Sequence, residues 1–115
     1  MINRIYRFHG HNSLSYLFKK GRVERVDFMS LKFAPGKQND YRLAVIVSKK
    51  VSKSAVVRNR IRRRIYEAIR VIKKNTETLW PYDMAITVYD ERTAKISHAE
   101  LSESIQKLLK KSKII

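Results

Sequence analysis

A basic segment in which apolar residues recur at helical spacing, residues 48–64, constrains this chain more than any other feature. The segment carries eight Lys or Arg side chains in seventeen positions. A segment needed only for solvation has no use for apolar spacing, whereas a helix that packs on a core and presents guanidinium groups from a rigid surface needs both. The pattern therefore predicts a helix with one buried face and one face for an anionic partner.

From Val56 onward the apolar residues fall on one side of the predicted helix, within about 120° at 100° per residue. The residues of this predicted core face are Val57, Ile61, Ile65, Ala68, Ile69 and Ile72. The opposite side, within about 60° and with Lys73 and Lys74 just outside it, is predicted to be exposed and to face phosphates. Its residues are Asn59, Arg63, Tyr66 and Arg70.

The charge of the whole chain supports a nucleic-acid partner. Twenty-six Lys and Arg against ten Asp and Glu give a net charge of +16, yet 43% of the 115 residues are hydrophobic. This length and composition predict one folded domain over residues 1–115 rather than a disordered tail. Because such a charge repels itself, we expect a polyanion to neutralise it, and nucleic acid fits best.

Two absences narrow the classes of protein further. The chain has no cysteine, which excludes disulfides, thiol catalysis and thiolate metal sites. No stretch approaches the roughly 20 apolar residues of a membrane-spanning helix, and no signal-peptide core follows Met1. We therefore expect a cytoplasmic protein without a membrane partner.

The first half of the chain predicts a short helix and two strands. Asn12 or Ser13 can cap a helix that ends before Gly21, a predicted helix over residues 12–20. Two extended stretches follow, residues 23–33 and 41–47, separated by a turn that begins with a Pro-Gly pair. We expect these two stretches to pair as a hairpin.

The second half predicts a strand and a final helix. Trp80-Pro81 ends the basic helix or the loop that follows it, and residues 83–89 have the composition of a largely buried strand. Ser97 and Glu100 have the spacing of a capping box, and apolar residues at helical spacing follow them. The predicted order is helix, strand, strand, helix, strand, helix.

The most specific motif in the chain is the run SKKVSKSAVVRNRIRRR, residues 48–64. A strand that ends in Ser-Lys-Lys, followed by a helix that starts with Arg-Asn-Arg, resembles the signature of the bacterial ribonuclease P protein family. The order of elements is similar along nearly the whole chain. The resemblance implies an α/β (α+β) sandwich, in which helices cover a small mixed four-stranded sheet. It also implies a left-handed βαβ crossover, where general rules predict a right-handed one.

The resemblance implies a role in tRNA maturation. The protein component of ribonuclease P assists a catalytic RNA, which uses bound Mg²⁺ to hydrolyse precursor tRNA and release the 5′ leader. The expected partners are therefore the catalytic RNA and precursor tRNA, with no small-molecule substrate. The enzyme is an endoribonuclease whose catalysis is carried by the RNA; the Mg²⁺ is bound mainly by the RNA, and no catalytic residue, metal site or intrinsic cofactor is expected in this chain.

The resemblance also assigns RNA-binding residues. Those at the family's Arg-Asn-Arg-x-basic-Arg positions, which dock on the catalytic RNA, are Arg58, Asn59, Arg60, Arg62 and Arg63. Lys49, Lys50 and Lys53 lead into this surface, and Arg70 extends it along the exposed side of the helix. Arginine forks match phosphate oxygens, and the free amides of a helix start add to an anion site.

In the family, a cleft between the first helix and the sheet holds the single-stranded leader. Phe18 matches one stacking position of this cleft, and Leu14 stands where many members carry an aromatic residue. Phe28 and Phe33 are further candidates. Core packing is an equally good interpretation of Phe18, because it has helical spacing with Leu14 and Leu17.

Two rival functions are carried forward. One is a structural RNA-binding protein, of ribosomal or RNA-chaperone type, with no role in cleavage. The net charge does not distinguish this function from that of a ribonuclease P protein. The other is a nuclease that acts alone, which the lack of a convergent carboxylate or His constellation disfavours. His9 and His11 lack a third metal ligand, and neighbouring Asp90 and Glu91 would point to opposite faces of a strand.

Overall fold

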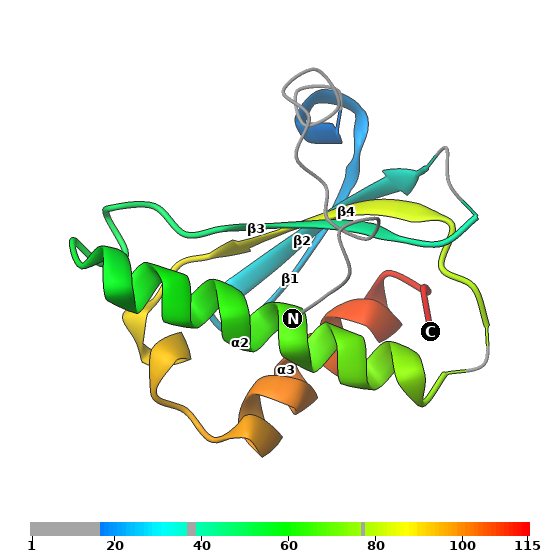
Figure 1. The fold of residues 1–115 in the computed structure, drawn as a ribbon. Helices are drawn as coiled ribbons and strands as arrows, with labels where there is room; N and C mark the ends of the chain where they lie inside the picture. Colours follow the sequence, from blue (N-terminus) through cyan, green and yellow to red (C-terminus); the bar gives the residue numbers. More distant parts are fainter. Residues whose placement is uncertain (1–16, 37–38, 77) are drawn as a thin grey trace.

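The computed structural model describes residues 17–36, 39–76 and 78–115, which form a four-stranded sheet with two helices against one of its faces (Figure 1). Residues 17–20 are helical and lead into the sheet. The remaining elements, in chain order, are strands β1 (Arg22–Val26), β2 (Met29–Pro35) and β3 (Arg42–Ile46), helix α2 (Ala55–Lys74), strand β4 (Tyr82–Val88), the 3-10 helix η2 (Glu91–Ala94) and helix α3 (His98–Lys111).

The sheet is mixed, with strands in the order β1-β2-β4-β3. Strand β2 is antiparallel to both β1 and β4, whereas β3 runs parallel to β4. Parallel neighbours need a crossover connection, and α2 provides it between β3 and β4. The predicted fold class, a small mixed four-stranded sheet covered by helices, is confirmed.

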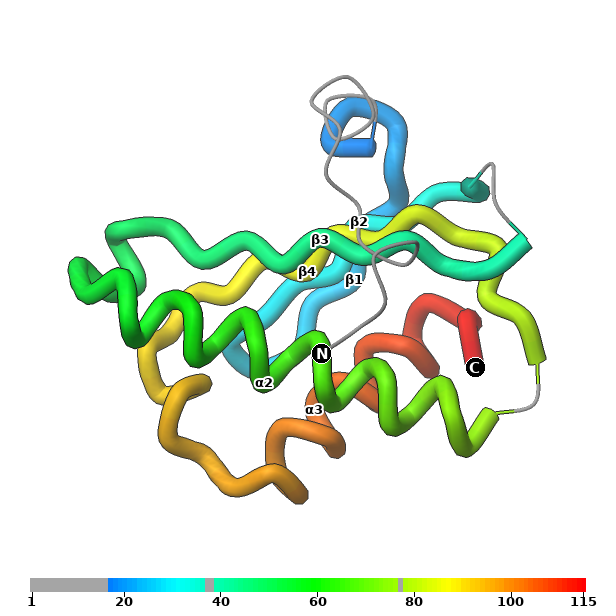
Figure 2. Tube along the Cα trace, in the orientation of Figure 1, coloured from blue at the N-terminus to red at the C-terminus, as the bar shows by residue number. Residues whose placement is uncertain are grey.

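The predicted hairpin between residues 23–33 and 41–47 is wrong. The first stretch breaks at Asp27, which has a φ of 49°, and the chain turns back there so that β1 and β2 pair with each other. Strand β4, which comes later in the chain, lies between β2 and β3 (Figure 2). In this central place a buried strand such as β4 gains hydrogen bonds along both of its edges. The spacing of residues along the chain does not show that β4, rather than β3, pairs with β2.

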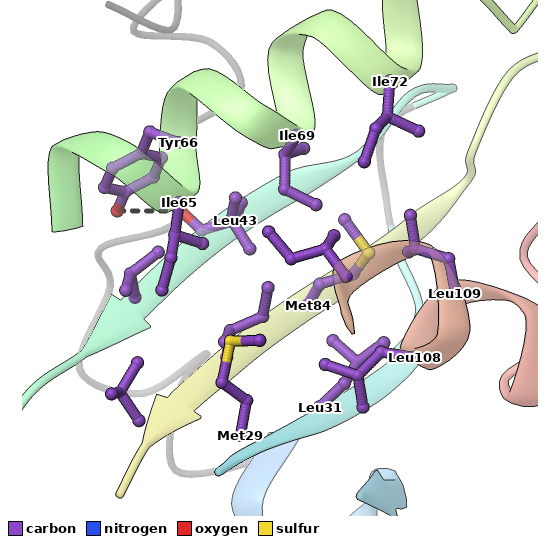
Figure 3. Packing of buried hydrophobic residues seen from close by; sticks show 14 of the residues in the cluster. Met29, Leu31, Leu43, Ile65, Tyr66, Ile69, Ile72, Met84, Leu108 and Leu109 are labelled. Atoms are coloured by element: carbon purple, nitrogen blue, oxygen red, sulfur yellow. Dashed lines mark hydrogen bonds between the residues drawn. The ribbon is translucent and has the colours of Figure 1, made fainter. Parts of the chain in front are cut away.

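Alternation along the strands separates two faces of the sheet. In β2, Met29, Leu31 and Phe33 belong to the large core under the helices, while Ala34 joins a small cluster with Leu17. The large core is filled by strand residues and by both helices (Figure 3). The buried residues from the helices are Ile61, Ile65, Tyr66, Ile69, Ile72, Leu101, Ile105, Leu108 and Leu109.

Helix α2 confirms the predicted core face, with one correction. Ile61, Ile65 and Ile69 are fully buried, and Val57 packs partly buried against them. Tyr66, predicted on the exposed side, is instead 9% exposed, and its hydroxyl donates to the Leu43 carbonyl oxygen at 3.4 Å (Figure 3). A tyrosine beside an apolar stripe can bury its ring while its hydroxyl reaches a strand carbonyl, which a helical wheel does not reveal.

The Ser97 half of the predicted capping box of the last helix is confirmed. Ser97 is the N-cap of α3, and its hydroxyl oxygen accepts a hydrogen bond from the Glu100 amide at 3.1 Å. A capping side chain satisfies one of the amides that have no partner within the helix. This fixes the start of α3 next to η2, on the side of the molecule where α2 begins.

Candidate nucleic-acid interface

The start of α2 is held by its own loop. Ser54 is the N-cap and accepts from the Val57 amide at 3.3 Å, while Ser52 accepts from the Ser54 amide at 3.2 Å. Arg58 turns back onto this loop and donates to the carbonyl oxygens of Ser52 and Lys53 at 2.9 and 3.1 Å. Arg58 thus stabilises the loop that carries the three lysines and keeps its positive charge beside it.

Asn59 and Arg62 form a second anchored pair. Arg62 donates to the Asn59 side-chain oxygen at 2.8 Å and to the Val47 carbonyl oxygen at 3.3 Å. The first contact lies along α2 and the second ties the helix to the end of β3. The Asn59 amide group can still donate to a ligand, because only its oxygen is used in this contact.

Arg60 and Arg63 are exposed, and within the described residues neither takes part in an ion pair. Arg60 directly precedes Ile61, and Arg63 lies between Ile61 and Ile65, both fully buried, so their backbone is held by the core. Guanidinium groups on such a support present several donors toward phosphate oxygens. We define the α2 basic surface as Lys49, Lys50, Lys53, Arg58, Asn59, Arg60, Arg62 and Arg63.

Arg70 stands apart from the α2 basic surface. It forms an ion pair with Glu67, one turn earlier on the helix, and its Nε donates to a Glu67 carboxylate oxygen at 3.1 Å. The hydrogen bond from Arg70 lowers the pKa of Glu67, so the carboxylate stays charged and competes for the guanidinium. Arg70 therefore offers less to an RNA phosphate than Arg60 or Arg63 does.

A shallow groove lies on the sheet face that the helices leave uncovered. Its volume is about 500 Å³. It is lined by Phe18, Val23, Glu24, Arg25, Ser30, Lys32, Thr87 and Tyr89. The helical turn before β1, strands β1, β2 and β4 and the residue after β4 thus contribute to one concave surface on the face away from α2.

Two ring and cation pairs line this groove. The Lys32 ammonium lies 4.9 Å from the centre of the Phe18 ring and donates to the Phe18 carbonyl oxygen at 2.6 Å. The Arg25 guanidinium lies 4.5 Å from the centre of the Tyr89 ring, and the hydroxyls of Tyr89 and Ser30 are 2.8 Å apart. Each pair places an aromatic ring beside a positive charge, a combination that is common in sites for single-stranded nucleic acid.

The structure excludes core packing as the interpretation of Phe18. Its side chain is 39% exposed at the groove, whereas Leu17 before it is 1% exposed and takes the core position. Leu14 lies outside the described residues. Phe18 is thus the one predicted cleft residue, among those that the structure describes, that lies in the groove.

Phe33 and Phe28 do not lie in this groove. The prediction for Phe33 is wrong, because strand alternation places its ring in the core under the helices, 5% exposed and edge-on to Tyr82 at 6.1 Å. Phe28 lies in the turn between β1 and β2, partly buried against that same core. Its ring contacts Arg92 at 5.8 Å and lines a separate pocket beside α3.

Sequence reasoning missed the groove residues that form or adjoin the two ring and cation pairs beside Phe18: Arg25, Ser30, Lys32 and Tyr89. Ser30 and Lys32 alternate with the buried Met29, Leu31 and Phe33, so the polar face of β2 could have been identified from that spacing. Tyr89 ends the stretch 83–89, which was predicted as a largely buried strand, but its side chain is 48% exposed. No local signal indicates that Tyr89 and Arg25 meet, since that contact depends on strand order.

Two other kinds of site are absent from the described part of the chain. No three His, Cys, Asp or Glu residues within it are grouped so as to hold a metal ion. None of its helices has the length and apolar character to cross a membrane. His9 and His11 lie outside the described residues.

Comparison with known proteins agrees with the fold and the motif. A family model described as ribonuclease P matches residues 2–113. The ribonuclease P protein component of Roseiflexus castenholzii is 30% identical over 114 residues, which cover 99% of this chain and 91% of that protein. The corresponding protein of Clostridium kluyveri is 32% identical over 108 residues, covering 94% and 95%.

Solved structures show the same fold. The RNase P protein of Staphylococcus aureus superimposes with a TM-score of 0.78 at 24% identity, covering 95% of this chain and 96% of that one. The RNase P protein of Thermotoga maritima gives 0.78 at 19% identity, covering 91% and 96%. With the family match over almost its full length, the chain belongs to the ribonuclease P protein family.

Proposed function

We propose that this chain binds the catalytic RNA of ribonuclease P through the α2 basic surface and holds the 5′ leader of precursor tRNA in the sheet groove. In this proposal the RNA, with its own bound Mg²⁺, cleaves the phosphodiester bond in the cytoplasm, and the protein contributes binding. The names of the relatives support one part of this proposal, the RNA partner, since a protein component of ribonuclease P has an RNA partner.

The observation that carries the docking proposal is the exposure of Arg60 and Arg63 on a helix whose other side is fully buried. Side chains on a rigid support lose less conformational freedom when they bind, so more of each contact appears as affinity. Arg58 and Arg62 are anchored to backbone carbonyls, which fixes their charges in place. An RNA backbone laid along this side of the protein would meet a preformed row of donors.

The groove suits a segment of varied sequence. Every base has an aromatic face, so stacking on Phe18 and Tyr89 tolerates any leader, at about 1–3 kcal/mol per base. Lys32 and Arg25 lie beside these rings and supply charge for the phosphates between bases. Binding of this kind would let one protein serve many precursor tRNAs.

The two surfaces lie on different sides of the sheet, so two RNA segments can bind at once. Two RNAs repel each other through their phosphates, and a protein of net charge +16 between them screens that repulsion. The expected effect is tighter binding of precursor tRNA and a lower requirement for divalent ions.

Reconstitution with the cognate RNA tests this function. Adding the purified protein at low Mg²⁺ should raise the rate of correct 5′ cleavage and the affinity for precursor tRNA. Binding to the RNA without a gain in cleavage would favour the structural RNA-binding alternative. Cleavage by the protein without added RNA would point to a nuclease that acts alone.

A further inference from the structure

A second cationic surface lies where α2 meets the start of α3. A cavity of about 470 Å³ opens there between the first turns of α2 and the segment that joins η2 to α3. Its charged and polar lining residues are Arg60, Arg63, Arg64, Lys95, Ser97 and His98. We call this cavity the α2–α3 pocket. Figure 2 shows the start of α2 beside η2 and the chain leading into α3.

The walls of the α2–α3 pocket are fixed to each other by Arg64. Its guanidinium donates to the Thr93 carbonyl oxygen at 2.8 Å and to the Ile96 carbonyl oxygen. Thr93 is fully buried, and its hydroxyl donates to the Asp90 carbonyl oxygen at 2.7 Å. Since Arg64 links α2 directly to the segment before α3, the pocket keeps its shape without a ligand.

The lining of the α2–α3 pocket has only one sign of charge. It contains three arginines and a lysine but no Asp or Glu. The pocket beside the other side of α3 differs, since three carboxylates, those of Asp27, Glu100 and Glu103, line it together with Arg92 and Lys107. Within the described residues, no ion pair involves Arg60, Arg63 or Lys95. Cations gathered in a concave surface focus a positive potential that favours an anion.

We propose that the α2–α3 pocket binds a phosphate group. Arg60 and Arg63 supply forked donors from α2, and Lys95 and His98 supply donors from the opposite wall. Ser97 caps α3 at the pocket edge, and the first amides of the helix add to the favourable field. In the assembled enzyme the phosphate comes from an RNA strand that continues from α2 past η2 to α3. This goes beyond the proposed docking surface, because Lys95 and His98 belong neither to α2 nor to the groove.

The first test uses inorganic phosphate and no RNA, so its outcome does not depend on the proposed function. The amide signals of the protein are followed by NMR during a phosphate titration. A titration with NaCl of equal ionic strength is the control. Signals of residues 95–99 should shift and saturate. Lys95→Glu should weaken phosphate binding about tenfold, as loss of a charge-assisted contact predicts. Lys110→Glu, the same charge change near the far end of α3, should leave it unchanged.

Two results would overturn the proposal. One is a set of small shifts spread over the whole cationic surface that never saturates, which is ionic screening. The other is a Lys95→Glu variant that is folded by circular dichroism yet binds phosphate as before. His98→Ala provides a second variant, since it removes a donor without adding a negative charge, and it should weaken binding in the same direction.

A second arm identifies the source of the phosphate. Affinity for the catalytic RNA is measured over a series of salt concentrations. Lys95→Glu should reduce the slope of log affinity against log salt by about 0.7 to 0.9, one phosphate contact, whereas Lys110→Glu should not. Phosphate binding without a change in this slope would identify free phosphate as the ligand. Failure of the catalytic RNA to bind the unchanged protein would refute the proposed function. The phosphate titration would still test whether the α2–α3 pocket binds phosphate.

Discussion

The α2 basic surface and the sheet groove both carry positive charge, but they hold it in different ways. In the α2 basic surface, cations project from one helix and the loop before it, and Arg58 and Arg62 are fixed by backbone carbonyls. In the groove, each cation lies over an aromatic ring, Lys32 over Phe18 and Arg25 over Tyr89. The first arrangement suits a phosphate backbone of defined shape, and the second suits unpaired bases. The difference is consistent with the proposal that this basic protein separates two RNA ligands by chemistry.

Charge reversal on α2 should have the largest effect. Arg60→Glu combined with Arg63→Glu should weaken binding to the catalytic RNA by about 100-fold or more, since each lost charge-assisted contact is worth about 1.5–3 kcal/mol. Filter binding or fluorescence anisotropy at fixed salt measures this. The matched control is Lys74→Glu with Lys110→Glu, two exposed lysines outside the α2 basic surface. Equal losses in both double variants would mean that net charge alone drives docking.

Loss of the aromatic rings in the groove should weaken binding of the 5′ leader only. Phe18→Ala or Tyr89→Ala should weaken binding of precursor tRNA to the assembled enzyme by about 1–3 kcal/mol for each lost stack. Binding of mature tRNA, which has no leader, should stay the same, and so should affinity for the catalytic RNA. Phe18→Tyr keeps an aromatic face and should retain most of the affinity. If mature tRNA loses as much as precursor, the groove does not hold the leader.

A stability variant tests whether the far end of α2 is separate from RNA binding. Asp40 accepts from the amides of Tyr41 and Trp80 at 2.9 and 3.1 Å and lies 3.3 Å from the Lys73 ammonium. Asp40→Ala leaves these groups without their acceptor and should lower the free energy of unfolding by about 1–3 kcal/mol.

Urea unfolding measures the loss at Asp40. Asp40→Asn is the control, because its side-chain oxygen can still accept from Trp80 and should restore part of the stability. RNA affinity of the folded Asp40→Ala protein should be unchanged. A drop in RNA affinity as large as that of the α2 variants would show that the two ends of the helix are coupled.

The smallest effect is expected at Arg70. Glu67→Gln removes the carboxylate that pairs with Arg70. Because exposed ion pairs contribute little, freeing the guanidinium should raise RNA affinity by no more than about fivefold. Titration at low salt, where surface charges are least screened, is the measurement. No change would place Arg70 outside the docking face, and a loss would mean that Glu67 itself orients the arginine for RNA.

Sequence-based prediction was accurate for features that depend on residues close together in the chain and less accurate for features that depend on distant contacts. The core face of α2 and the Ser97 cap were predicted correctly, because both depend on residues within one or two turns of each other. Phe33 was placed in the wrong layer, although the alternation of Ser30 and Lys32 with buried neighbours carried the information. Tyr66 was misplaced because its hydroxyl finds its acceptor on β3, far away in the sequence.

By itself the sequence determined that this chain folds around a basic amphipathic helix and that it needs a polyanionic partner. Helical periodicity and net charge are properties of short segments and of simple sums, so no tertiary contact is required to read them. Only the tertiary structure decided that β4 lies between β2 and β3, which rings face the groove, and that α2 and α3 share a cationic pocket. These features depend on contacts between distant parts of the chain, and many pairings of the same strands satisfy the local pattern equally well.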